Sequence, residues 1–511
     1  MADSNKFIEK ITAAYGFKGE SFVAGGGMLD GKVVENATIR IPLKTMNRHG
    51  LIAGATGTGK TKTLQMLAEG LSDASVPVVL MDIKGDLSGI GAAGSPNEKI
   101  LDRCKLLGIE YKPAAYPVEF LSLSQQKGTR LRATVSEFGP VLLSRILGLN
   151  DTQESFVAMI FKYCDDHKLP LVDLKDMIKV LQFASNEGKA ELTKDYGNIS
   201  TASLGTILRK LIELQQQGAD LFFGETSFEV DDLMRIDDSG RGMVSVIRVT
   251  DLQDRPKLFS TFMLQLLAEL YASCPEEGDA DKPKLVLFID EAHLIFNEAS
   301  EALLQQIETI VKLIRSKGIG IFFCTQNPMD IPASVLAQLG MKVQHALRAF
   351  TAADRKTIKQ TAENYPLTEF YDTDELITAM GIGEALITLL NEKGIPSELV
   401  HTMMAPPKSR MDILTDAEIN AIISHSKLAA KYDQLVDEKS AYEILTEKLN
   451  NAAESKTKEK EKDISADKGK EKGFFDDPIV KSMTRTAGNT IVRGLLGVLG
   501  LGGSRRRRSL F

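Results

Sequence analysis

Gly54-Ala55-Thr56-Gly57-Thr58-Gly59-Lys60-Thr61 is the stretch of this 511-residue sequence that decides its fold. It satisfies the pattern G-x-x-x-x-G-K-[ST] at every fixed position. An apolar run, residues 51–53, precedes it, and a run with helical spacing, residues 63–71, follows it. Strand, glycine loop and helix are the context in which this pattern cradles the phosphates of a nucleotide. Because both flanks fit, we favour this interpretation over a glycine-rich loop that arises by chance.

The residue types in this loop suit a triphosphate. Glycines let the backbone curl so that successive N–H groups point inward, and the following helix adds the positive end of its dipole. We expect Lys60 to reach the β- and γ-phosphates and the Thr61 hydroxyl to be a ligand of Mg²⁺. The residues predicted to bind ATP are Gly54, Ala55, Thr56, Gly57, Thr58, Gly59, Lys60, Thr61 and Thr63.

The composition is that of a core-forming protein without an overall affinity for polyanions. The chain is 43% hydrophobic, its net charge is −7 and its isoelectric point is about 5.6. Four scattered cysteines form no C-x-x-C pair, which argues against a zinc site and a disulfide framework. The sequence has no apolar run of spanning length and begins with polar residues, so we expect a cytoplasmic protein without a transmembrane segment.

Charged residues follow the next predicted strand, the apolar run 77–82. Asp82, Lys84 and Asp86 come at its carboxyl end. In open α/β sheets this edge of the strands borders the ligand-binding crevice, which makes all three candidate site residues. The alternative is a solvated loop that turns at Gly85.

A later apolar run, residues 285–289, ends in Asp290 and Glu291, which is the Walker B form. Two carboxylates at the end of a buried strand are costly unless a positive group lies nearby, and a magnesium–nucleotide complex provides one. We predict that Asp290 binds Mg²⁺ and that Glu291 activates the attacking water. His293 either couples this site to the next element or is a half-buried structural residue.

A third buried strand, predicted at residues 319–324, is followed by Thr325-Gln326-Asn327-Pro328. The Gln326 amide can bond both a phosphate oxygen and water, so we predict that it senses the γ-phosphate. The alternative is that Asn-Pro only marks a turn.

These strands and helices predict an α/β fold: a RecA-like P-loop NTPase with a mostly parallel central sheet, a helical insertion and a disordered C-terminal linker. Apolar residues at helical spacing define the insertion. The insertion either forms a lid or a surface for a partner or has only a packing role. In the tail, an apolar segment, residues 491–501, is followed by Arg505–Arg508. This part either contacts an anionic membrane, a nucleic acid or a partner, or is a glycine-rich tail that is ordered only in an assembly. The predicted divisions are residues 1–45 (lead-in), 46–119 (first part of the core), 120–240 (helical insertion), 241–410 (second part of the core), 411–452 (C-terminal helices), 453–473 (charged linker) and 474–511 (tail).

With these motifs the sequence resembles the HerA/FtsK branch of P-loop ATPases, most closely the YjgR group of bacterial HerA-like proteins. The resemblance rests on Gly54–Thr61, Asp82–Gly89, Leu287–His293 and Cys324–Pro328, and it covers most of the chain. It implies ATP hydrolysis in a ring, expected to be a homo-hexamer. It also implies an arginine supplied in trans, for which Arg315 is the candidate and Arg348 and Arg410 are alternatives.

The chain departs from its translocating relatives, since the 45 residues before the core are too few for the N-terminal β-barrel domain of HerA-type helicases. The leading hypothesis is a Mg²⁺-dependent ring motor acting on DNA. The alternatives are a nucleotide-switched interaction protein and an ATPase that remodels protein, with an unknown protein partner at the helical insertion or the tail.

Overall fold

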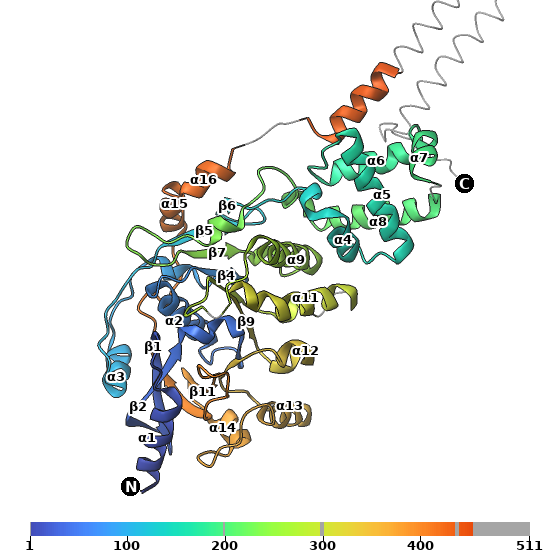
Figure 1. Ribbon diagram of the computed structural model, residues 1–511. Coiled ribbons are helices and arrows are strands. Elements are labelled where there is room, and N and C mark those ends of the chain that lie inside the picture. The colour runs from blue at the N-terminus through green and yellow to red at the C-terminus, as the bar shows by residue number, and fades with distance from the viewer. Residues whose placement is uncertain (1, 198–199, 279, 297–300, 435–438, 453–511) are drawn as a thin grey trace, which may run out of the picture. The chain divides into compact units, whose positions relative to one another are not determined.

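The computed structural model describes residues 2–197, 200–278, 280–296, 301–434 and 439–452 (Figure 1). The chain divides into two units, Met1–Glu443 and Ile444–Phe511. In the second unit the described residues, 444–452, are helical. The predicted linker and tail, residues 453–511, lie outside the described residues.

The described strands form a 12-stranded sheet in the order β2-β1-β12-β11-β10-β3-β9-β8-β4-β7-β5-β6. Neighbours from β10 to β6 in this order are parallel, and those from β2 to β10 are antiparallel. The prediction of a mostly parallel sheet is therefore confirmed. The strands are β1 Ser21–Leu29, β2 Lys32–Pro42, β3 Gly50–Ala53, β4 Val78–Asp82, β5 Val118–Ser122, β6 Thr129–Arg130, β7 Val244–Arg248, β8 Leu285–Ile289, β9 Ile319–Thr325, β10 Met341–Gln344, β11 Glu384–Thr388 and β12 Val400–Met404.

Helices cover both faces of the sheet. The main apolar core joins α1, α2 and α15 to inward side chains of the strands, while α9 and α11 pack together on the other side. The helices are α1 Ala2–Tyr15, α2 Lys60–Asp73, α3 Glu98–Leu107, α4 Val135–Ile146, α5 Asp151–His167, α6 Leu174–Ser185, α7 Lys189–Tyr196, α8 Thr201–Gln216, α9 Pro256–Ser273, α10 His293–Phe296, α11 Glu301–Ile314, α12 Ala333–Leu336, α13 Ala352–Ala362, α14 Thr373–Ala379, α15 Asp416–Ser424 and α16 Lys427–Tyr432. None of the helices in the described ranges is long and apolar enough to cross a membrane.

The helical insertion is present as α4–α8, whose members pack on one another (Figure 1). Its predicted first boundary falls inside β5, and β6 also belongs to the sheet, so the segment just after position 119 is core. Glu119 breaks the apolar pattern of β5, which hid the strand. Asn150 and Gln153 form the capping box that begins α5.

β1 is a strand that the sequence pattern did not predict. It contains Gly25-Gly26-Gly27, which resembles a turn in the sequence. The structure shows a packing reason for the glycine at position 25: a Cβ there would lie 2.0 Å from the Met403 carbonyl oxygen of β12. Close approach of two backbones, rather than a turn, accounts for this glycine.

His49 fixes the start of β3, the strand that leads into the glycine loop. Its Nε2–H donates to the Val311 carbonyl of α11 at 2.8 Å, and its Nδ1 accepts from the Ile321 N–H of β9 at 3.0 Å. The tautomer follows because a carbonyl only accepts and an amide N–H only donates. Burial lowers the pKa of His49 to about 4, so the ring is neutral in the folded protein at neutral pH.

We expect His49 to make the fold sensitive to acid. The pKa of His49 is about 4 in the folded protein, against an ordinary value of 6.5. Between these pH values the imidazole is protonated in the unfolded chain but neutral in the folded protein. The stability that is present above pH 6.5 is therefore lost as the pH falls towards 4. Between pH 7.5 and 5.0 the loss should be about 2 kcal/mol. His49→Asn should abolish this part of the pH dependence, because an asparagine side chain does not titrate. Asparagine is chosen because it tolerates the φ of 58° at this position.

Urea unfolding at both pH values measures the effect. Replacement of the exposed His425 by Asn is the matched control and should leave the pH dependence intact. The same dependence in His49→Asn as in the unaltered protein would contradict the assignment.

Candidate nucleotide-binding and catalytic site

The glycine loop lies between β3 and α2, as its sequence context predicts. Gly54, Gly57 and Gly59 adopt φ values of 151°, 78° and 116°. These conformations favour glycine, and they curl the loop backbone at the start of α2, which is the geometry of anion-binding glycine loops. The loop therefore has the form of an anion cradle.

Lys60 is buried and folds back over this loop. Its Nζ donates to the Gly54 carbonyl at 2.6 Å and to the Ala55 carbonyl at 3.1 Å. Burial lowers the pKa of Lys60, and the nearby Asp290 and Glu291 carboxylates oppose that shift. The ammonium group is thus held at the loop between two carbonyl oxygens, from which it can turn to a phosphate.

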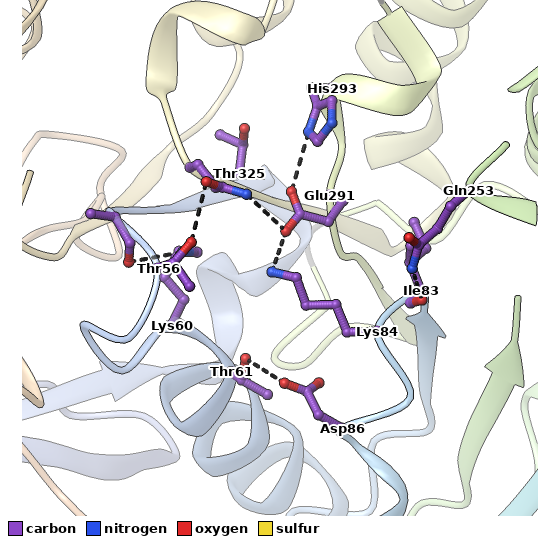
Figure 2. Close-up of polar contacts among 12 residues, drawn as sticks. Thr56, Lys60, Thr61, Ile83, Lys84, Asp86, Gln253, Glu291, His293 and Thr325 are labelled. Atoms are coloured by element: carbon purple, nitrogen blue, oxygen red, sulfur yellow. Dashed lines mark hydrogen bonds and ion pairs between the residues drawn. The ribbon is translucent and has the colours of Figure 1, made fainter. Parts of the chain in front are cut away.

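Carboxylates gather beside the loop at the ends of β4 and β8. The Thr61 hydroxyl donates to Asp86 Oδ2 at 3.2 Å (Figure 2). Burial raises the pKa of Asp82 to about 7 and that of Asp290 to about 6. Asp82, Asp86 and Asp290 each keep one buried oxygen without a hydrogen-bond partner.

This donor set fits Mg²⁺. Hard oxygen ligands and uncompensated negative charge are what that ion requires. Among the described residues no three His, Cys, Asp or Glu side chains are grouped to hold a metal by themselves. Phosphate oxygens and water would therefore complete the coordination that Thr61 and Asp290 begin, which is the usual arrangement for Mg²⁺ in nucleotide sites.

Glu291 lies at the centre of the site, just after β8 (Figure 2). Its carboxylate pairs with the Lys84 ammonium, lies 3.2 Å from His293 Nδ1 and accepts from Gln326 Nε2 at 3.4 Å. Its φ of 45° is unusual for a residue with a side chain. Strain of this kind persists only where surrounding contacts fix it, and it is frequent at catalytic positions.

Gln326 connects this carboxylate to the glycine loop. Its Oε1 accepts from the Thr56 hydroxyl at 3.3 Å while its amide nitrogen donates to Glu291. The side chain thus spans the gap between the loop and the carboxylate, where a terminal phosphate would lie.

Lys84 and His293, for which the sequence left alternatives open, both lie against Glu291.

The three arginine candidates lie elsewhere. Arg315 precedes β9 whereas Gln326 follows it, so the two lie at opposite edges of the sheet, roughly 20 Å apart along the strand. Arg348 donates to the Thr378 carbonyl at 3.1 Å, and Arg410 donates to both carboxylate oxygens of Glu418 at 2.9 and 3.1 Å. In the part of the chain that the structure describes, none of the three arginines forms a hydrogen bond or an ion pair with the carboxylates of this chain's own site. Arg315 shares a cavity of about 450 Å³ with Lys44, Arg48 and Lys312.

His345 supports the loop from beneath, and sequence reasoning missed it. Its Nδ1–H donates to the Glu384 carbonyl at 2.8 Å, so its Nε2 accepts from the Thr63 hydroxyl at 2.9 Å. Burial lowers the pKa of His345 to about 4, which keeps it neutral. Thr63 is itself buried and its hydroxyl makes this contact with His345, and its role as a nucleotide ligand stays a prediction. His345 directly follows β10, and no short motif in the sequence marks it.

Sheet order and site geometry together define a RecA-like P-loop ATPase. The comparisons with known proteins then name the family. Residues 29–507 match the family described as helicase HerA-like C-terminal, and the chain belongs to that family.

Its relatives and structural neighbours are distant. The chain is 22% identical over 389 residues to the DNA double-strand break repair helicase HerA of Saccharolobus solfataricus, covering 74% of this chain and 68% of the relative. It is 23% identical over 372 residues to the protein of the same name from Sulfurisphaera tokodaii, covering 71% and 66%. The chain thus spans about two thirds of these relatives.

The solved structure of the bacterial conjugative coupling protein TrwBdeltaN70 has a similar fold. It superposes with a TM-score of 0.52 and 14% identity, over 80% of this chain and 94% of that one. The plasmid coupling protein TrwB bound to a GTP analogue gives a TM-score of 0.51, also at 14% identity, over 78% and 99%. The match confirms the predicted fold class.

We predict that Gly54→Ala destabilises the loop more than Gly57→Ala does. A Cβ at position 54 would lie 2.5 Å from His345 Cβ, and the φ of 151° disfavours a side chain, whereas a Cβ at position 57 meets nothing within 4 Å. The expected costs are about 2 kcal/mol or more for Gly54→Ala and about 1 kcal/mol for Gly57→Ala, where only the positive φ is penalised. Urea unfolding without nucleotide measures both, and equal losses would show that His345 does not support the loop.

Proposed function

We propose that this protein is a Mg²⁺-dependent, ATP-hydrolysing ring motor that acts on DNA. The observation that carries the proposal is the convergence of Lys60, Glu291 and Gln326, from the ends of three neighbouring strands, on one space beside the glycine loop. Binding groups alone would suffice for a nucleotide switch, but a carboxylate opposite the loop, on a residue with a strained backbone, is suited to hydrolysis.

In the proposed reaction each residue has a separate task. Lys60 turns from the Gly54 carbonyl to the β- and γ-phosphates and neutralises part of their charge. Glu291 accepts a proton from the water that attacks the γ-phosphate, and Gln326 holds that water in line. Mg²⁺ held by Thr61 and Asp290 would lower the cost of charge on the phosphates.

Lys84 links ATP binding to the activation of Glu291. Its ammonium is paired with Glu291, and a γ-phosphate would compete for the same positive charge. We propose that ATP draws Lys84 away and releases Glu291 to act as the base. This arrangement restricts the carboxylate until a substrate is present.

The proposed ring would bring an arginine from a neighbouring subunit to each site. Arg315 lies at the edge of the sheet opposite Glu291, and in the proposed homo-hexamer it would act in a neighbouring subunit's site. Such an arginine contributes roughly 10³- to 10⁵-fold in rate. The names of the relatives, which include helicases and the DNA import protein CedB of Sulfolobus acidocaldarius, support DNA as the polymer. The four buried, unpaired cysteines suit the cytoplasm.

We expect Glu291→Gln to retain ATP binding and to lose turnover. Glutamine preserves the size of the side chain but cannot accept the proton, and general bases contribute roughly 10²- to 10⁴-fold. Steady-state phosphate release and equilibrium binding of ATP measure the two effects separately. Glu363→Gln, at an exposed position, is the control and should match the unaltered protein. Full turnover by Glu291→Gln would refute the assignment.

We also predict that DNA stimulates the ATPase. The rate should rise several-fold on addition of single- or double-stranded DNA, and the gain should shrink as salt increases, because phosphate contacts release counterions. The same titration on Lys60→Ala gives the background. If neither form of DNA changes the rate at low salt, the motor does not act on DNA, and a protein substrate or a nucleotide-switched interaction becomes the better assignment.

A further inference from the structure

The loop Met380–Gly383 borders the glycine loop on the side away from Glu291. In the sheet, β9 and β8, which precede Gln326 and Glu291, lie on one side of β3, whereas β10 and β11 lie on the other. Under the proposed function, the terminal phosphate faces Glu291. The ribose and the base then extend away from β8 and β9, towards the side on which Met380–Gly383 precedes β11.

This loop is attached directly to the glycine loop. The Gly383 N–H donates to the Thr58 carbonyl at 2.9 Å. A Cβ on Gly59 would come within 3.2 Å of the Gly383 backbone, so the two loops are in contact. Whatever projects from Met380–Gly383 therefore lies beside a nucleotide whose phosphates occupy the cradle.

The backbone of the loop is held rigidly. Arg103 of α3 donates to the Ile382 carbonyl at 3.0 Å and to the Gly383 carbonyl at 2.9 Å. The Gly381 N–H donates to the Glu384 carboxylate at 2.9 Å. A Cβ on Gly383 would lie 2.5 Å from the Arg103 guanidinium, and its φ is +74°, so this tight arrangement depends on glycine.

One large apolar side chain is exposed on this rigid support. Ile382 is 71% exposed, whereas Met380 is 2% exposed and packs inward. An isolated exposed isoleucine is ordinary on a protein surface. Here, however, the four hydrogen bonds described above fix the backbone of the loop next to the phosphate cradle. A flat ring that covered the Ile382 side chain there would remove apolar area from water.

We propose that Ile382, on the loop fixed by Arg103 and Thr58, is the surface against which the purine base of the bound nucleotide packs. The side chains of Met380–Gly383 carry no hydrogen-bonding groups, so the contact is with the face of the ring. It therefore contributes affinity for purine nucleotides without distinguishing adenine from guanine. This inference rests on the proposed function, because it uses the orientation that Glu291 imposes on the triphosphate.

The test compares ligands with and without a base on the full chain. For Ile382→Ser we expect the dissociation constants of MgATP and MgGTP to rise about tenfold, which corresponds to about 1.4 kcal/mol, while that of inorganic tripolyphosphate stays unchanged. For Ile382→Phe we expect tighter ATP and GTP binding, because an aromatic ring stacks on the base, and again no change for tripolyphosphate. Ile236→Ser, at a 54% exposed isoleucine beside β7, is the matched control and should alter none of the three constants.

The outcomes separate this inference from the proposed function. Equal changes for ATP and tripolyphosphate, or no change for either variant, would overturn it. A change in oligomeric state without a change in ATP affinity would also overturn it and would identify Ile382 as a protein contact. Lys60→Ala tests the phosphate site independently, and we expect it to lose both ATP and tripolyphosphate binding. If Lys60→Ala still bound both ligands, that result would count against the proposed function and not against the role of Ile382.

Discussion

The structure depends on how negative charge is held at the carboxyl edge of its parallel strands. Asp82 and Asp290 are buried there, and burial raises the pKa of both carboxyl groups. Lys84 and Lys60 supply the opposing positive charge from two different loops. Such a cluster is expensive in a core without its partners, because each uncompensated ion loses its hydration. Under the proposed function, phosphates and Mg²⁺ would form new ion pairs with the lysines and carboxylates of this cluster, which is why we place binding and hydrolysis at the same edge.

Two buried, neutral histidine rings support the glycine loop, one on each side along the chain. His49 holds the strand before the loop and His345 holds the helix after it, and both rings are neutral because they are buried. Neither ring touches the carboxylates directly, so they fix the position of the cradle without adding charge to it. The cradle is thereby preorganised, and little reorganisation is needed when phosphates arrive.

The asymmetry of the sheet around β3 gives the site its direction. Residues suited to chemistry follow β8 and β9 on one side, and a rigid loop with an exposed isoleucine precedes β11 on the other. Arg315 lies at the far edge of the sheet, and this geometry favours a neighbouring subunit as its target. In the proposed ring, a neighbouring subunit would complete each site, while the base and the phosphates would be bound by one chain.

The sequence by itself determined the glycine loop, the apolar strands and the acidic pair at Asp290 and Glu291, because these depend on residue type and short spacing. It also indicated the family. It failed at β1, where glycines permit close backbone approach, and at β5, where Glu119 interrupts the pattern. Only the tertiary structure decided that Lys84 pairs with Glu291, that His345 bonds Thr63 and that Gly383 bonds Thr58. These contacts join residues about 200 or more positions apart, 84 with 291, 345 with 63 and 383 with 58, so they follow from strand order and not from any local pattern.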